Sequence, residues 1–185
     1  MKEIRLHGIG GMGTVKAGEI LVHETVKEGK YGNSMPFFGF ERQGAPVTSF
    51  VRLDDKPIRP KNKVYQPDCV IVLDPSLLVS ANVFEGLNDN SIFVVNSRIE
   101  NLEAIKISDR VARIAYVDAT DIAMELLNRA IPNTIMLGAF ARATGWAERK
   151  SLEEVIVKFF GEKNREAFRR GYDEVKVIEL GEGQL

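Results

Sequence analysis

The chain contains very little cysteine, histidine or tryptophan: one, two and one residue among 185. A single cysteine, Cys69, can form no disulfide within the chain, and it cannot hold an iron–sulfur cluster, which needs several thiolates. Cys69 lies in an apolar run, so we expect a buried, inert thiol rather than a nucleophile. His7 and His23 are isolated and lack metal-ligand spacing, so no metal site is expected. His7 ends a predicted strand, where packing is favoured over a role in a site.

The chain also lacks a long apolar run and an excess of either charge. No apolar stretch approaches the roughly 20 residues that span a bilayer. The N-terminal residues 1–5 are charged and then alternate, unlike a signal peptide. The 25 basic and 26 acidic residues leave a net charge of -1, without the basic excess typical of nucleic-acid binding. We therefore expect a cytoplasmic protein with no membrane or nucleic-acid partner.

Apolar runs alternate with segments of helical spacing along the whole chain. The continuous runs 69–73 and 91–96 are typical of central strands buried on both faces. Residues 47–53 alternate, and with a short return strand at 57–59 they predict a β-hairpin at the sheet edge. The sequence thus predicts an α/β fold, three-layer αβα, with a mainly parallel sheet plus the added hairpin. Because 44% of the residues are hydrophobic, one core is expected, with 1–185 as a single domain.

Helix starts are marked by residues that cap helices. Asp74-Pro75 predicts a helix to about Val83, Thr120 is expected to cap a helix over 121–129, and Ser151-Leu152-Glu153-Glu154 reads as a capping box. Asp118 and Asp121 have the spacing of capping and dipole-complementing carboxylates. Further helices are predicted at about 102–105, opening at 131–134 and including 136–143 with a nearly all-round apolar surface, and at about 163–174.

Residues 8–14, Gly-Ile-Gly-Gly-Met-Gly-Thr, join the first predicted strand to the first predicted helix. Gly8, Gly10 and Gly13 satisfy G-x-G-x-x-G in that context. Glycine permits positive φ and close approach, and helix N-terminal N–H groups favour anions, so the loop can bind a phosphate. A dinucleotide site would also need an acidic residue about 20 positions later, and residues 29–36 contain none. The remaining alternative is a tight turn that only packs helix on sheet.

Residues 36–46 form a second notable stretch, with three phenylalanines and no helical or strand period. An aromatic loop of this kind is expected to be buried against its own domain, a ligand or another subunit. Arg42 offers a planar fork for carboxylate or phosphate. The alternative is a solvated pair of Glu41 and Arg42. No set of nucleophile, base and orienting residue is found by motif, and no P-loop follows the glycines, so binding or assembly is favoured over complete chemistry.

Six blocks occur along the chain in this order: Gly10–Gly13, Phe37–Pro46, Lys56–Arg59, Val72–Leu78, Val117–Thr120 and Pro132–Ala139. Together they resemble the gamma subunit of 2-oxoacid:ferredoxin oxidoreductases of the pyruvate and 2-ketoisovalerate kind. The resemblance covers nearly the whole chain, and its E-R-x-G-A-P and P-N-T-x-x-L-G-A blocks are specific.

The resemblance implies an enzyme subunit of the pyruvate synthase type. Such complexes oxidatively decarboxylate a 2-oxoacid, form an acyl-coenzyme A and reduce ferredoxin. Thiamine diphosphate and [4Fe-4S] clusters are implied in the partner alpha, beta and delta subunits, with this chain non-catalytic and inactive alone. The alternative is a free-standing dinucleotide-binding, Rossmann-like protein.

The resemblance also implies cofactor-binding positions, with coenzyme A at the surface of the chain. The family loop usually reads G-G-Q-G, and Met12 stands here at the Gln position, which weakens the case for a direct polar contact. The 2-oxoacid and the partner of Arg42 stay open, pyruvate being the first candidate. The implied positions are Gly8, Gly10, Gly11, Gly13, Thr14, Glu41, Arg42 and Gly44.

Overall fold

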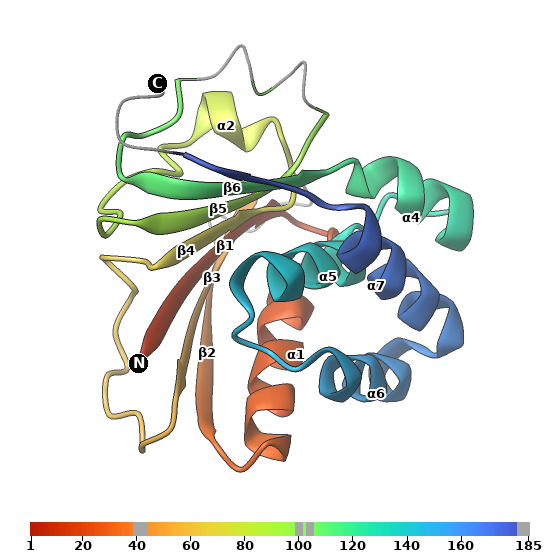
Figure 1. The fold of residues 1–185 in the computed structure, drawn as a ribbon, viewed down its shortest axis with the longest axis horizontal. Helices are drawn as coiled ribbons and strands as arrows, with labels where there is room; N and C mark the ends of the chain where they lie inside the picture. Colours follow the sequence, from red (N-terminus) through yellow and green to blue (C-terminus); the bar gives the residue numbers. More distant parts are fainter. Residues whose placement is uncertain (39–43, 99–101, 103–105, 181–185) are drawn as a thin grey trace.

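The structure is a computed structural model that describes residues 1–38, 44–98, 102 and 106–180 (Figure 1). A seven-stranded sheet with the order β2-β3-β1-β4-β5-β6-β7 forms its centre. The strands are β1 (Lys2–Ile9), β2 (Tyr31–Phe38), β3 (Pro46–Asp54), β4 (Cys69–Val72), β5 (Ser91–Asn96), β6 (Val111–Val117) and β7 (Lys176–Glu179).

Strand direction confirms the predicted fold class. Strands β1, β4, β5 and β6 pair in parallel, whereas β3 pairs antiparallel with both β1 and β2, and β7 antiparallel with β6. Because β2 is antiparallel to β3, it points the same way as β1, so five strands share one direction. The hairpin at the edge is β2–β3. The prediction of a return strand at 57–59 is wrong. Strand β3 pairs instead with β2, which precedes it in the chain, and residues 57–59 form no strand.

Long helices cover one face of the sheet, as Figure 1 shows for α1, α5, α6 and α7. Apolar residues of β1, β3 and β4 pack there against α1 and α5 in the larger core. The opposite face buries Val70, Val72, Phe93 and Val95 under α2 and the connecting segments. The helices are α1 (Thr14–Lys27), α2 (Leu77–Ser80), α4 (Ala119–Leu127), α5 (Asn133–Thr144), α6 (Arg149–Phe160) and α7 (Glu162–Glu174).

Helix α5 passes so close to α7 that glycine is needed on both helices. A Cβ on Gly138 would lie 2.2 Å from the Phe168 carbonyl oxygen, and a Cβ on Gly171 would lie 2.1 Å from the Ile135 carbonyl oxygen. Ten of the twelve residues of α5 are buried, which confirms the predicted all-round apolar helix. Gly138 belongs to the P-N-T-x-x-L-G-A block, so part of that motif has a packing reason.

Several predicted helix starts are displaced. Asp118, not Thr120, caps α4, since its carboxylate accepts a hydrogen bond from the Asp121 N–H. Glu148, not Ser151, caps α6 and accepts from the Ser151 N–H at 2.6 Å. Helix α2 ends at Ser80, so the expected extension to Val83 is wrong. The helix predicted at 102–105 falls largely outside the described residues.

Candidate functional site

The glycine loop lies at the carboxyl end of β1, where it turns into α1. Gly8 is still part of β1, while Gly11 and Gly13 take φ values of 99° and 80° that favour glycine. The Met12 N–H closes the turn on the Ile9 carbonyl at 3.2 Å. The sequence prediction of a strand, a glycine turn and a helix start is therefore confirmed.

The start of α1 offers unused N–H groups. Ala17 donates the first intrahelical hydrogen bond, to the Gly13 carbonyl, so the N–H groups of Thr14, Val15 and Lys16 have no acceptor within the helix. No side chain among the described residues caps this helix, and no acidic residue lies in its first turn. The helix dipole places partial positive charge at the same point. An anion can bind here without displacing a capping carboxylate.

Two of the predicted glycines also have packing reasons. A Cβ on Gly8 would lie 2.0 Å from Oγ1 of Thr14, and a Cβ on Gly13 would lie 2.4 Å from Nδ2 of Asn133. Thr14 is 2% exposed, and its buried Oγ1 has no hydrogen-bond partner among the described residues. Buried hydroxyls are normally paired, so the unpaired Thr14 hydroxyl is consistent with a ligand beside the loop.

The structure joins the glycine loop to the second predicted motif. The Gly10 N–H donates to the Ala45 carbonyl at 3.0 Å, and Gly44 next to it is exposed with a φ of 88°. Glu41 and Arg42, the other residues predicted in this motif, lie outside the described residues. No sequence pattern indicated this contact, because it joins residues 35 positions apart through the backbone alone.

The prediction of a loop is wrong for the start of the aromatic stretch. Residues 36–38 continue strand β2. Phe37 and Phe38 are 47% and 57% exposed, so they are not buried against their own domain, and the expected cover by a ligand or another subunit stays a prediction. The earlier residues of β2 follow no apolar pattern, so only pairing with β3 reveals how far this strand extends.

A cavity of about 490 Å³ lies beside Asn133. Asn133 begins α5, and its side-chain Oδ1 accepts a hydrogen bond from the Thr134 N–H at 2.9 Å; the first turn of this helix has no acidic residue. Asn133 is the link between this cavity and the glycine loop, because it lines the cavity and also packs on Gly13, while no residue of the loop itself lines the cavity. Arg129 and Lys163 line the cavity with Glu162, whose carboxylate pairs with Arg165. We call the glycine loop (residues 8–14), the start of α1 and the cavity beside Asn133 the glycine corner. It combines the free N–H groups of α1 with the cationic side chains of Arg129 and Lys163.

His7 lies next to this corner on β1 and is held neutral. The Arg5 Nε donates to Nε2 of His7 at 3.0 Å, and the Arg5 guanidinium also donates to the carbonyls of Val83 and Glu85. Burial first, and the Arg5 charge second, lower the pKa of His7 to about 3. Burial likewise raises the pKa of the Cys69 thiol, which lies fully within the core, so the prediction of an inert thiol is confirmed.

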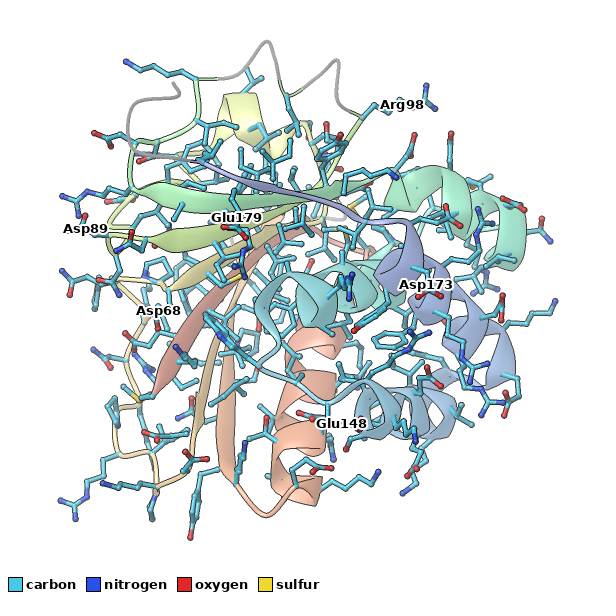
Figure 2. All side chains as sticks on the ribbon, in the orientation of Figure 1. Asp68, Asp89, Arg98, Glu148, Asp173 and Glu179 are labelled. Atoms are coloured by element: carbon cyan, nitrogen blue, oxygen red, sulfur yellow. The ribbon has the colours of Figure 1, made fainter. Side chains whose placement is uncertain are left out.

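Other polar side chains at the carboxyl ends of the strands serve the fold. Asn96 at the end of β5 donates to the Leu73 carbonyl at 2.8 Å and accepts from the Ala119 N–H at 2.9 Å. Arg98, near the start of α4 in Figure 2, pairs with both Asp118 and Asp121. The prediction that Asp118 and Asp121 cap a helix rather than catalyse is consistent with these partners.

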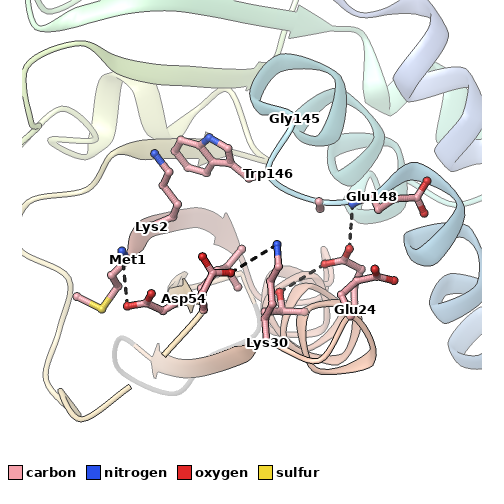
Figure 3. Close-up of a pocket in the computed structure, with 13 residues that line it drawn as sticks. Met1, Lys2, Glu24, Lys30, Asp54, Gly145, Trp146 and Glu148 are labelled. Carbon is pink, nitrogen blue, oxygen red and sulfur yellow. Dashed lines mark hydrogen bonds and ion pairs between the residues drawn. The ribbon is translucent and has the colours of Figure 1, made fainter. Parts of the chain in front are cut away.

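A second cavity, of about 430 Å³, lies at the opposite end of β1 and α1 (Figure 3). Its Glu24 carboxylate accepts from the Glu148 N–H at 2.9 Å, and Lys2 stacks over the Trp146 ring at 4.6 Å. Burial raises the pKa of Glu24. No motif in the sequence indicated this cavity, because its lining comes from four separate segments.

Comparison with known proteins identifies the family. Residues 3–174 match the family model described as pyruvate ferredoxin/flavodoxin oxidoreductase. The chain belongs to this family.

None of the helices in the described ranges is long and apolar enough to cross a membrane.

Relatives within the oxidoreductase family are gamma subunits. The chain is 48% identical to the pyruvate/ketoisovalerate oxidoreductases common subunit gamma of Pyrococcus furiosus, covering 97% of this chain and 100% of the relative. It is 44% identical to pyruvate synthase subunit PorC of Methanothermobacter thermautotrophicus, covering 97% and 99%. The crystal structure of pyruvate oxidoreductase subunit PORC from Thermotoga maritima has a TM-score of 0.84 at 39% identity, covering 96% and 98%.

These comparisons confirm the resemblance drawn from the sequence blocks: the chain is a gamma-type subunit of this oxidoreductase family. The comparisons do not support the alternative of a free-standing Rossmann-like protein. They leave the individual site residues as predictions.

Proposed function

We propose that the chain is the non-catalytic gamma subunit of a cytoplasmic, ferredoxin-dependent 2-oxoacid oxidoreductase, with pyruvate as the first candidate substrate. Residues 1–185 act as one domain in this assembly. The alpha, beta and delta subunits hold thiamine diphosphate and the [4Fe-4S] clusters, and the complex forms an acyl-coenzyme A and reduces ferredoxin. Identity of 48% to a gamma subunit over nearly the whole chain carries this proposal.

Purification of the tagged chain produced together with its companion subunits tests the assembly. We expect three further polypeptides, bound thiamine diphosphate and the visible absorbance of iron–sulfur clusters. Pyruvate-dependent reduction of ferredoxin should require the complex and be absent from the isolated chain. A chain that decarboxylates pyruvate without companions would refute the proposal.

Within the complex, the role of the glycine corner is to contact the phosphates of coenzyme A. The unused N–H groups at the start of α1 and the unpaired Thr14 hydroxyl fit a phosphate oxygen. Arg129 and Lys163 supply positive charge in the cavity on the other side of Asn133. Coenzyme A brings an acyl-accepting thiol to the reaction, and this chain's part is to hold the nucleotide end of the molecule.

Charge reversal at the corner tests the coenzyme A contact. A variant with Arg129→Glu and Lys163→Glu should raise the KM for coenzyme A by about a hundredfold or more, since each of the two lost hydrogen bonds to a charged group costs about 1.5–3 kcal/mol and 1.4 kcal/mol is tenfold. The KM for the 2-oxoacid should not change. Lys150→Glu with Lys158→Glu on α6 is the matched control, with the same change of charge. An unchanged KM for coenzyme A in the corner variant would refute the contact while leaving the subunit assignment intact.

A further inference from the structure

The segment between β3 and β4 concentrates positive charge that the balanced composition conceals. Its residues 56–63, here called the basic segment, include Lys56, Arg59, Lys61 and Lys63 and no acidic residue. The whole chain has a net charge of -1. None of these four cations forms an ion pair within the described part of the chain. Figure 1 shows the segment along the side of the sheet away from the long helices.

Buried contacts fix the basic segment to the hairpin. The Arg52 guanidinium, 4% exposed, donates to the Asn62 carbonyl at 2.8 Å and the Lys63 carbonyl at 3.1 Å, and it pairs with Glu3 at 2.6 Å. The Asn33 amide of β2 donates to the Pro60 carbonyl at 3.2 Å. The fold therefore holds the backbone of the basic segment, from which the cationic side chains extend, in a defined position.

Exposed aromatic rings accompany these cations. The Lys63 ammonium lies 3.7 Å from the ring centroid of Phe37, which is 47% exposed. Tyr65, two residues after Lys63, is 66% exposed. Exposed aromatic rings beside cationic side chains are typical of a protein interface, where aromatic residues supply much of the binding energy and charges select the partner.

The open edge of β2 is unsuited to a continuous ladder with an added strand. Pro36 lies in the middle of this edge strand and has no N–H to donate. Proline at such a position hinders pairing with another strand. Contact at this surface must therefore be made mainly by side chains.

We propose that the basic segment, with Phe37 and Tyr65, is the docking surface for an acidic face of another subunit of the oxidoreductase. This inference rests on the proposed function, because it requires a multi-subunit complex. A second copy of this chain is disfavoured, because a two-fold interface would place four positive charges against the same four charges. An acidic partner instead neutralises cations for which the described part of the chain provides no carboxylate.

Charge reversal with a matched control tests the docking surface in the co-produced complex. Lys61→Glu with Lys63→Glu should reduce the companion subunits recovered with the tagged chain about tenfold, in line with the energies of close interfacial charge pairs. Lys150→Glu with Lys158→Glu makes the same change of charge on α6 and should recover the companions fully. Circular dichroism of each purified variant shows whether it is folded. Full recovery with the basic-segment variant would overturn the inference.

Lysine footprinting of the unmodified complex gives a second readout that does not depend on folding of a variant. Acetylation of Lys56, Lys61 and Lys63 should slow at least fivefold on assembly, while Lys150 reacts as in the free chain. A carbodiimide, which joins amines to carboxylates, should link these lysines to Asp or Glu of one companion subunit. Unchanged acetylation, or links between two copies of this chain, would refute the inference. Failure of the wild-type chain to assemble at all would refute the proposed function, and this inference with it.

Discussion

Replacing Gly138 with alanine should destabilise the fold although alanine is the better helix former. The added Cβ would lie 2.2 Å from the Phe168 carbonyl oxygen and 2.6 Å from the Tyr172 nitrogen. Both are backbone atoms of α7, so no change of rotamer can relieve the contact. Overpacking costs about 1–3 kcal/mol, and more against rigid backbone, whereas alanine gains about 1 kcal/mol in helix propensity. We expect a net loss of about 2 kcal/mol.

Urea unfolding of the isolated chain, followed by circular dichroism, measures this loss. A loss of 2 kcal/mol corresponds to a fall in Tm of about 4–8 °C for a domain of this size. Gly171→Ala meets the Ile135 carbonyl in the same interface, so the double variant should lose less than the sum of the single losses. Equal or higher stability of Gly138→Ala would refute the argument that α5 and α7 pack at backbone contact.

Three further predictions concern buried polar groups. Asn96→Ala should cost about 2–3 kcal/mol in urea unfolding, because it leaves the Leu73 carbonyl and the Ala119 N–H without their buried partner; a loss below 1 kcal/mol would contradict this. The pKa of His7 is lowered in the fold from 6.5 to about 3, so only the unfolded chain takes up this proton between those values. Stability should therefore fall as pH falls from about 6.5 to 3, and His7→Gln should remove that part of the slope. Arg52→Met should cost about 3 kcal/mol by leaving Glu3 without its partner, and it should speed proteolysis within residues 56–63; unchanged cleavage would show that Arg52 does not hold this segment.

Burial alone was enough to predict the centre of the sheet. Strands β4 and β5 are buried on both faces, so they appear as continuous apolar runs in any sequence reading. The edge strands carry no such signal. All four residues of β7 are exposed, and this strand is positioned by pairing with β6 and by the ion pair of Arg113 with Glu179, 66 positions apart.

The glycine corner was predictable only in part, for a similar reason. Local geometry requires positive φ at Gly11 and Gly13, so the turn could be predicted from the glycines. Ala45 and Asn133 contact Gly10 and Gly13 only in the folded chain, and no local sequence pattern indicates these contacts. Cap residues failed at Thr120 and Ser151 because another acceptor, Asp118 or Glu148, lay two or three positions earlier.

The pairing of β7 with β6 also decides where the chain can be lengthened. Because Glu179 lies opposite Arg113 and Lys176 opposite Tyr116, the last strand runs back toward the end of the sheet where β1 begins. Lys2 and Leu180 therefore lie at the end of the sheet remote from the glycine corner. A fused reporter or an immobilising tether attached next to Lys2 or Leu180 would leave that corner unobstructed.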